Sequence, residues 1–125
     1  MRIEATGPRT AEEVWAFYTR PSTWPTWAPQ ISSVHGVDDP ISPGARGVVH
    51  GPLLVRVPFV IESVDEAARR WTWRVGIGPL SVVLDHGVDQ LESGCCAWAE
   101  VHAPYVMVLP YSPLARLALR RLAGG

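Results

Sequence analysis

Apolar and polar residues alternate along most of the chain between residues 31 and 103. In the stretch LSVVLDHGVDQL at 80–91, one face collects Leu80, Val82, Leu84, His86 and Val88. At 70–77 the same alternation collects Trp71, Trp73, Val75 and Ile77. A period of two is typical of β-strands with one buried face. With the turn residues between segments, it predicts a short strand at 2–6 and further strands at 31–37, 44–50, 55–64, 70–77, 80–91 and 95–103.

A helical spacing of three to four residues precedes residue 21. Thr10 is suited to cap a helix, and the acidic pair Glu12 and Glu13 lies in its positively polarised first turn. The apolar face of this helix consists of Val14, Phe17 and Tyr18. Pro21 has no backbone N–H to donate, so it prevents the helix from continuing.

Two further segments carry helical signals. The stretch STWPTWAPQI places Trp24 and Trp27 three residues apart between prolines, which favours one short helical turn with its indoles at the edge of a core. Near the end of the chain, Ser112 is a natural cap and Pro113 fits the first helical position. The apolar stripe that this last helix would present consists of Leu114, Leu117, Ala118 and Leu122.

The elements follow in the order strand, two short helices, six strands and a last helix. Short turns join the strands, which predicts an antiparallel sheet and an α+β fold in one domain, residues 1–125. Since 47% of the residues are hydrophobic, the chain can bury a substantial core. We expect mostly buried side chains at Val57, Phe59, Ile61, Trp71, Trp73, Val75, Val82 and Leu84. We expect exposed side chains at Glu66, Arg69, Glu92 and Arg120.

Charge and composition argue against several classes of function. The formal net charge is −1 and all 11 basic residues are arginine, a balance that gives no electrostatic case for binding nucleic acid. No run reaches the roughly 18 apolar residues of a membrane span, and the start of the chain lacks an apolar stretch of signal-peptide length. The adjacent Cys95 and Cys96 would point to opposite faces of a strand, which favours reduced thiols. These features, with arginine usage typical of a GC-rich bacterial genome, favour a soluble cytoplasmic protein.

Four features together resemble one protein superfamily. They are the segment EEVWAFYTRPSTWPTWAPQISSV at 12–34, the glycines Gly44 and Gly47, the segment ESVDEAARRWTWRV at 62–75 and the amphipathic last helix. In these respects the chain is similar to the START and pollen-allergen-like superfamily (SRPBCC), which includes polyketide cyclases and dehydratases. The resemblance covers the whole chain and implies a helix-grip fold. In that fold a curved antiparallel sheet wraps around a C-terminal helix, with two short helices after the first strand.

The same resemblance implies a hydrophobic cavity between the sheet and the last helix. Pro110 and Pro113 limit that helix to about three turns. Either the cavity is therefore smaller than in the superfamily, or the segment PYVMVLPY at 104–111 completes its wall. We expect a small hydrophobic or aromatic molecule as the partner and no cofactor, with a homodimer left open. No local spacing supplies the three or four converging ligands of a metal site.

His86 is the strongest candidate for chemistry, because alternation places it with Leu84 on the face that would look into the cavity. Two interpretations are open. His86 is either a packed core histidine with a satisfied hydrogen bond or a residue that contacts the ligand and moves a proton. A bulge at Gly87 would shift the register and turn the side chain away.

Other residues are candidates for the wall of the same cavity. Core packing explains Trp71 and Trp73 fully, but indoles in a half-filled cavity would also stack on a planar ligand. Pro104 directs Tyr105 toward the far wall, where its hydroxyl would polarise a carbonyl. His50 is either an exposed turn histidine or a residue at the cavity mouth, and Tyr18 is expected to be packed with its hydroxyl at a wet edge. With His86 and Tyr105 in catalytic roles, the expected ligand-binding residues are Trp73, Trp71, His50, Leu84, Ala99, Trp27 and Leu117.

Two functions of different classes fit these residues. In the first, the protein folds a reactive poly-carbonyl substrate and promotes its cyclisation or dehydration, with His86 moving the proton. In the second, the cavity carries a lipid or other hydrophobic metabolite without changing it. The sequence contains no Gly-x-Ser-x-Gly nucleophile motif and no glycine-rich phosphate loop. The few polar residues on the inward faces favour simple binding.

Overall fold

The computed structural model describes residues 1–52, 55–103 and 112–125. Its elements are β1 (Arg2–Gly7), α1 (Ala11–Tyr18), η1 (Pro21–Thr23), α2 (Trp24–Trp27), β2 (Ser33–His35), β3 (Arg46–His50), β4 (Arg56–Asp65), β5 (Arg70–Val75), η2 (Gly78–Leu80), β6 (Val82–Gln90), β7 (Cys95–His102) and α4 (Ser112–Leu122). Both η elements are single turns of 3-10 helix. This order is the predicted one, except that the sequence pattern did not predict η2 between β5 and β6.

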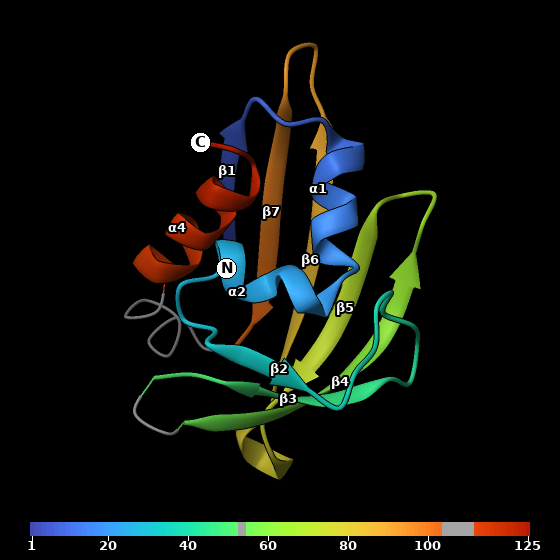
Figure 1. Cartoon of the computed structure of the whole chain (residues 1–125), viewed down its shortest axis with the longest axis vertical. Coiled ribbons are helices and arrows are strands. Elements are labelled where there is room, and N and C mark those ends of the chain that lie inside the picture. Colours follow the sequence, from blue (N-terminus) through green and yellow to red (C-terminus); the bar gives the residue numbers. More distant parts are fainter. Residues whose placement is uncertain (53–54, 104–111) are drawn as a thin grey trace.

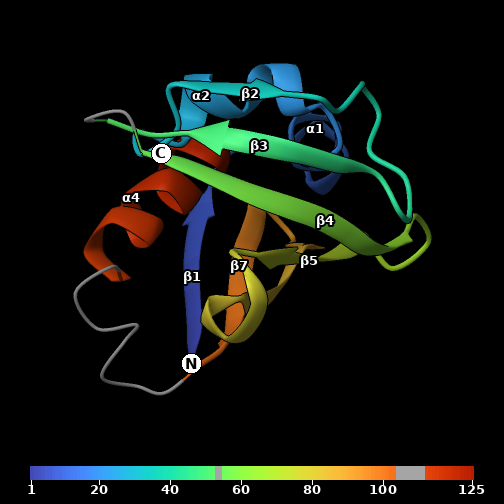
Figure 2. The ribbon, with the colours of Figure 1, turned by 90° about the horizontal axis from the view of Figure 1, so that it is seen from below.

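Within the described residues, seven strands form one antiparallel sheet in the order β1-β7-β6-β5-β4-β3-β2. The sheet is strongly curved: β1, β6 and β7 stand upright in Figure 1, whereas β2 and β3 run across its lower part. The helices α1, α2 and α4 lie on the concave side, and Figure 2 shows α4 alongside β1. This arrangement is the predicted helix-grip α+β fold.

Local sequence determines where α1 begins. The Glu13 N–H donates to the Thr10 hydroxyl at 3.1 Å, and the Thr10 N–H donates to the Glu13 carboxylate at 3.3 Å, which completes a capping box. At the end of β6, the Gln90 side-chain oxygen accepts a hydrogen bond from the Ala11 N–H at 2.7 Å. The start of α1 is therefore tied to the sheet, and the N–H groups of Ala11 and Glu13 are satisfied.

The C-terminal end of α4 is fastened to the turn after β1. The Arg9 N–H donates to the Ala123 carbonyl at 3.1 Å, and the Arg9 guanidinium donates to the Leu122 carbonyl at 3.0 Å. Gly7 allows this close approach, because a Cβ at that position would lie 2.2 Å from the Ala123 carbonyl oxygen. With 11 residues, α4 makes about three turns, as predicted.

The buried stripe of α4 corrects part of the sequence prediction. Ala118 and Leu122 are buried as predicted, but Leu114 and Leu117 are each 37% exposed. Ala115 and Leu119 are buried in their place. Both stripes satisfy a helical spacing of three to four residues, so the pattern alone did not determine which one faces the sheet.

The inward side chains of the central strands pack into the core, as alternation predicts. Phe59, Ile61 and Trp71 are buried. The remaining predicted core residues are only partly buried: Val57, Trp73, Val75, Val82 and Leu84. Glu66, Glu92 and Arg120 are exposed as predicted. Arg69 is half-buried instead of exposed, because its carbonyl accepts a hydrogen bond from the Val88 N–H and holds this turn against β6.

Alternation fails at the turn between β5 and β6. Ile77 and Leu80, which the pattern placed on buried faces, are 71% and 78% exposed. The strand β5 ends at Val75, and Gly76 and Gly78 have φ values of 112° and 52° that turn the chain into η2. Outside a strand, a period of two no longer determines the direction of a side chain.

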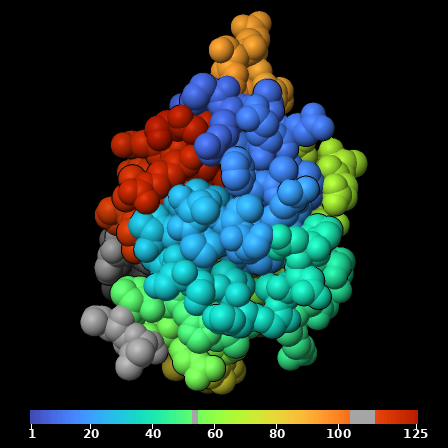
Figure 3. Space-filling model, in the orientation of Figure 1, coloured from blue at the N-terminus to red at the C-terminus, as the bar shows by residue number. Residues whose placement is uncertain are grey.

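Helices close one side of the molecule. In Figure 3, the segment from α1 to α2 fills the centre of the view, with α4 beside it and β2 and β3 below. The concave face of the sheet lies behind this layer. Within the described part of the chain, no helix is long and apolar enough to cross a membrane.

Candidate functional site

His86 lies in a regular part of the sheet and faces its concave side. It pairs with Trp71 in β5 and with Ala99 in β7. The register through Gly87 continues without a shift, and the irregularity of the sheet lies instead in β4, between Ile61 and Ser63. The predicted inward direction of His86 is therefore confirmed, and the bulge considered at Gly87 is absent.

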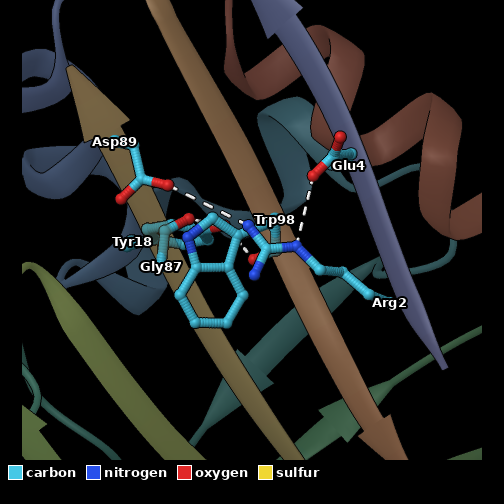
Figure 4. A network of polar contacts seen from close by, with 6 residues as sticks. All are labelled: Arg2, Glu4, Tyr18, Gly87, Asp89 and Trp98. Carbon is cyan, nitrogen blue, oxygen red and sulfur yellow. Dashed lines mark hydrogen bonds and ion pairs between the residues drawn. The ribbon is translucent and has the colours of Figure 1, made fainter. Parts of the chain in front are cut away.

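The outer face behind His86 is closed by a tryptophan. Trp98 in β7 covers Gly87 so closely that a Cβ there would lie 2.3 Å from the indole Cζ2 atom. The guanidinium groups of Arg2 and Arg70 lie 4.5 Å and 5.1 Å from the Trp98 ring. Figure 4 shows Arg2 across the indole, reaching toward Glu4 and Asp89 on either side. This cation–π layer shields the backbone that carries His86.

Tyr18 supports the same strands from the concave side. Its hydroxyl lies 3.1 Å from the Gly87 carbonyl oxygen and 3.2 Å from the Trp98 carbonyl oxygen, on the side of the sheet opposite the Trp98 indole (Figure 4). The side chain is fully buried, and burial strongly raises the pKa of its hydroxyl. The expectation of a hydroxyl at a wet edge is therefore wrong. The Tyr18 hydroxyl donates its hydrogen bond to the backbone of the sheet, so its role is structural.

Aromatic rings surround the His86 imidazole. Its ring stacks on Trp71, with centroids 4.4 Å apart and planes 18° apart. Trp24 also stacks on Trp71, with centroids 5.5 Å apart and planes 19° apart. Tyr18 and Trp73 approach the imidazole at centroid distances of 5.7 Å and 5.9 Å. His86 thus belongs to a cluster of aromatic rings supplied by α1, α2, β5 and β6.

Within the described ranges of the chain, several polar atoms in this cluster are buried without a hydrogen-bond partner. They are both ring nitrogens of His86 and the indole nitrogens of Trp27, Trp71 and Trp73. Two other tryptophans are satisfied: Trp15 donates to Glu66 at 2.9 Å, and Trp24 donates to the Tyr18 carbonyl at 3.0 Å. On the outer face, the Trp98 indole nitrogen is also buried without a described partner. Because buried polar groups in folded proteins are nearly always paired, such a concentration of unpaired ones marks this region as unusual.

Burial also determines the protonation state of His86. The side chain as a whole is half-buried, but both ring nitrogens are buried, and this burial lowers the pKa of the imidazole to about 3. The nearby Asp85 carboxylate acts in the opposite direction, with a smaller effect. The ring is therefore neutral near pH 7, with one N–H donor and one acceptor nitrogen. Asp85 itself lies on the outer face, where it accepts hydrogen bonds from Thr72 at 2.5 Å and from His102 at 2.8 Å.

The structure brings most of the predicted site residues together. Trp71, Trp73, Leu84, Ala99 and His86 lie on the inward faces of three adjacent strands, with Leu84 paired to Trp73. Trp27 of α2 joins them through an edge contact with Tyr18, at a centroid distance of 5.9 Å. On β7, the neighbours of His86 are small, because Ala97 and Ala99 occupy the inward positions.

Three predicted residues are not part of this group. His50 lies on the outer face of β3, where its ring contacts His35. Leu117 is on the exposed side of α4. Tyr105 falls outside the described residues. Sequence reasoning also missed Trp24 and Tyr18 as members of the cluster, although the helical spacing of Tyr18 after Val14 was a usable signal for an inward direction.

Comparisons with proteins of known structure show the same fold. Ara h 8.0201 matches 100% of this chain over 97% of its own, with 16% sequence identity and a TM-score of 0.68. DynU16, from the dynemicin biosynthetic locus, matches 99% of this chain with 18% identity and a TM-score of 0.79. The di-domain ARO/CYC protein BexL, from the BE-7585A biosynthetic pathway, matches 99% with 15% identity and a TM-score of 0.77.

The chain spans only 45% of DynU16 and 46% of BexL. A comparison with curated proteins gives no match. The model of one protein family, described as polyketide cyclase / dehydrase and lipid transport, matches residues 1–118 of this chain. The chain, with its helix-grip fold and aromatic inner face, therefore belongs to this polyketide cyclase / dehydrase and lipid transport family.

Proposed function

We propose that the aromatic cluster around His86 binds a small hydrophobic molecule that has a flat ring system and carbonyl-type oxygens. The observation that carries this proposal is the set of unpartnered nitrogens of His86, Trp27, Trp71 and Trp73. Three indoles supply three donors, and a neutral imidazole supplies one donor and one acceptor. A ligand rich in acceptor oxygens and poor in hydroxyl groups complements this set best.

The energetics favour such a ligand over a plain hydrocarbon. A buried polar group without a partner costs about 1–3 kcal/mol, and a carbonyl oxygen placed among these donors would remove part of that cost. The surrounding rings would meet the flat faces and edges of an aromatic ligand in offset or edge contacts. The small side chains of Ala97 and Ala99 would leave room beside His86, in a cavity between the sheet and α4.

A pair of matched probes tests this binding function. Fluorenone and fluorene have nearly the same shape, but only fluorenone carries a carbonyl oxygen. Titration with tryptophan fluorescence as the readout should show fluorenone binding about five- to tenfold more tightly, as expected for one net hydrogen bond to buried donors. Equal affinities for both compounds, or no binding of either, would refute the proposal.

A pair of variants locates the ligand. Ala99→Leu adds bulk beside His86 on the inner face and should weaken fluorenone binding about tenfold or more by overfilling the site. Glu100→Leu introduces the same side chain at the next residue, on the outer face, and should leave the affinity unchanged. A loss of binding in both variants, or in neither, would place the ligand elsewhere.

A second function, dehydration of a bound hydroxy ketone, is favoured by the burial of an ionisable group in this cluster. In that reaction His86 would take the proton from the carbon beside the carbonyl, and would return it to the departing hydroxyl, which leaves as water. A pKa of about 3 makes the imidazole a weak base, so we place simple binding first.

Turnover of 4-hydroxy-4-phenylbutan-2-one to benzylideneacetone and water distinguishes the two functions. A dehydratase should accelerate this reaction, and His86→Phe should abolish the acceleration while keeping affinity for fluorene. A protein that binds fluorenone but does not accelerate the reaction would be a carrier of hydrophobic molecules.

A further inference from the structure

A second group of polar side chains gathers on the outer face of the sheet, away from the aromatic cluster. A hollow of about 520 Å³ is lined by His35, Gly36, Arg46, Gly47, Val48, His50 and Arg56. We call it the outer hollow. The strand register explains the grouping, because His50 in β3 pairs with Ser33 in β2 and with Arg56 in β4. Val49, the next residue along, pairs with Val34 and Val57 and packs against the core on the other face.

Positive charge accumulates in the outer hollow without a carboxylate to balance it. Neither Asp nor Glu is among the described residues that line it. Within the described chain, the guanidinium groups of Arg46 and Arg56 form neither a hydrogen bond nor an ion pair. By contrast, other outer-face arginines are paired: Arg2 with Glu4 and Arg74 with Glu62. The guanidinium donors of Arg46 and Arg56 are therefore available to a ligand.

Two imidazoles lie in the hollow beside the guanidinium groups. The rings of His35 and His50 are in edge contact, with centroids 4.7 Å apart and planes 87° apart. The pKa of His50 is lowered by its partial removal from water, and further by His35 and Arg56. A metal ion would meet two guanidinium charges and only two imidazole ligands, whereas an anion would relieve the repulsion.

We propose that the outer hollow binds a phosphate monoester group. The oxygens of a phosphate match the planar forks of two arginines, each of which can donate two parallel hydrogen bonds. The imidazoles of His35 and His50 would supply further donors when protonated. The group would belong either to a small soluble phosphorylated metabolite or to the headgroup of phosphatidic acid. This site lies on the opposite face from the aromatic cluster, so it is independent of the function proposed there.

NMR of the histidine rings tests this site with glycerol 3-phosphate as the probe. Binding should shift the ring resonances of His35 and His50 and raise the pKa of His50, because the bound anion stabilises the imidazolium. The ring resonances of His86, on the inner face, should not move. Arg56→Gln should weaken binding about tenfold or more through the loss of charge-assisted hydrogen bonds. Arg74→Gln, an outer-face arginine outside the hollow, should leave the affinity unchanged.

The results separate the proposal from its alternatives. Unmoved His35 and His50 resonances, or equal affinity in wild type, Arg46→Gln and Arg56→Gln, would overturn it. Sedimentation with vesicles that contain phosphatidic acid, compared with pure phosphatidylcholine vesicles, identifies the source of the phosphate group. Vesicle binding that Arg56→Gln abolishes would assign the headgroup, whereas binding of glycerol 3-phosphate alone would assign a soluble metabolite.

Discussion

His86 carries the two buried nitrogens that distinguish the inner face of the sheet from an ordinary aromatic core. Its ring is stacked on Trp71 like an apolar side chain, yet neither nitrogen has a hydrogen-bond partner among the residues that the structure describes. A phenylalanine at this position would stack as well without leaving polar atoms unpaired. The histidine is therefore costly for the fold, and the ligand proposed above would offset that cost by pairing with its nitrogens.

The first prediction concerns the pH dependence of stability. The pKa of His86 is about 3 in the folded protein and near 6.5 in the unfolded chain, so the unfolded chain binds more protons between these values. This contribution to the free energy of unfolding falls as the pH falls from about 6.5 toward 3, by at most about 1.4 kcal/mol per pH unit. His86→Phe should flatten the slope by about one proton and should be at least as stable as wild type near pH 7.

Urea denaturation at several pH values measures this slope. If His86→Phe keeps the wild-type slope, the account of the burial of His86 is wrong.

The second prediction concerns the contact between Gly87 and Trp98. A Cβ at residue 87 would overlap the Trp98 indole, which the Arg2 and Arg70 guanidiniums hold in place. Gly87→Ala should therefore lower the free energy of unfolding by about 1–3 kcal/mol. In the double variant with Trp98→Val, Gly87→Ala should cost much less, because the overlap is gone. Additive effects in this double-mutant cycle would contradict the predicted overlap.

Among the elements, those with a strong local signal were predictable. Alternation placed His86, Trp71 and Trp73 on the inward face, and the signals at Thr10 and Pro113 located two helices. The errors lie where the local pattern does not determine the direction of a side chain. Ile77 and Leu80 lie where glycines end the strand, so alternation no longer applies to them. Leu117 lies at the border of a helical stripe, and His50 faces outward on β3.

The unpartnered nitrogens had no signal in the sequence at all. Whether an indole N–H finds a carbonyl depends on contacts between elements that are distant along the chain. Trp15 donates to Glu66, 51 residues along the chain, whereas Trp27, Trp71 and Trp73 have no partner in the part of the chain that the structure describes. Residue types and spacing therefore identified members of the cluster, but only the fold revealed its excess of donors.

The third prediction concerns the start of α1, which carries Tyr18 into the cluster. Thr10→Ala removes the hydroxyl that caps the Glu13 N–H and should lower the free energy of unfolding by about 1 kcal/mol. Thr10→Ser keeps the oxygen and should cost only a few tenths of that value. Thermal denaturation compares the variants, and equal losses for alanine and serine would show that the methyl group, not the cap, stabilises the helix.

At the scale of the whole molecule, the sheet separates two different environments. The concave face holds aromatic rings and neutral nitrogens beneath α1, α2 and α4, while the outer face holds charged side chains such as Arg46 and Arg56. The one-domain organisation over residues 1–125 stays a prediction. The central claim is that the buried indole and imidazole nitrogens on the inner face form hydrogen bonds with oxygen atoms of a bound molecule.

Proton–nitrogen NMR of the indole N–H groups tests that claim most directly. Addition of fluorenone should shift the Trp27, Trp71 and Trp73 indole signals downfield, as expected for new hydrogen bonds to an acceptor, and fluorene should not. The indole signals of Trp98, on the outer face, and of Trp24, which already donates to a carbonyl, should stay in place with both compounds. Fluorenone binding that leaves the Trp27, Trp71 and Trp73 signals unmoved, or that shifts the Trp98 signal instead, would contradict the account.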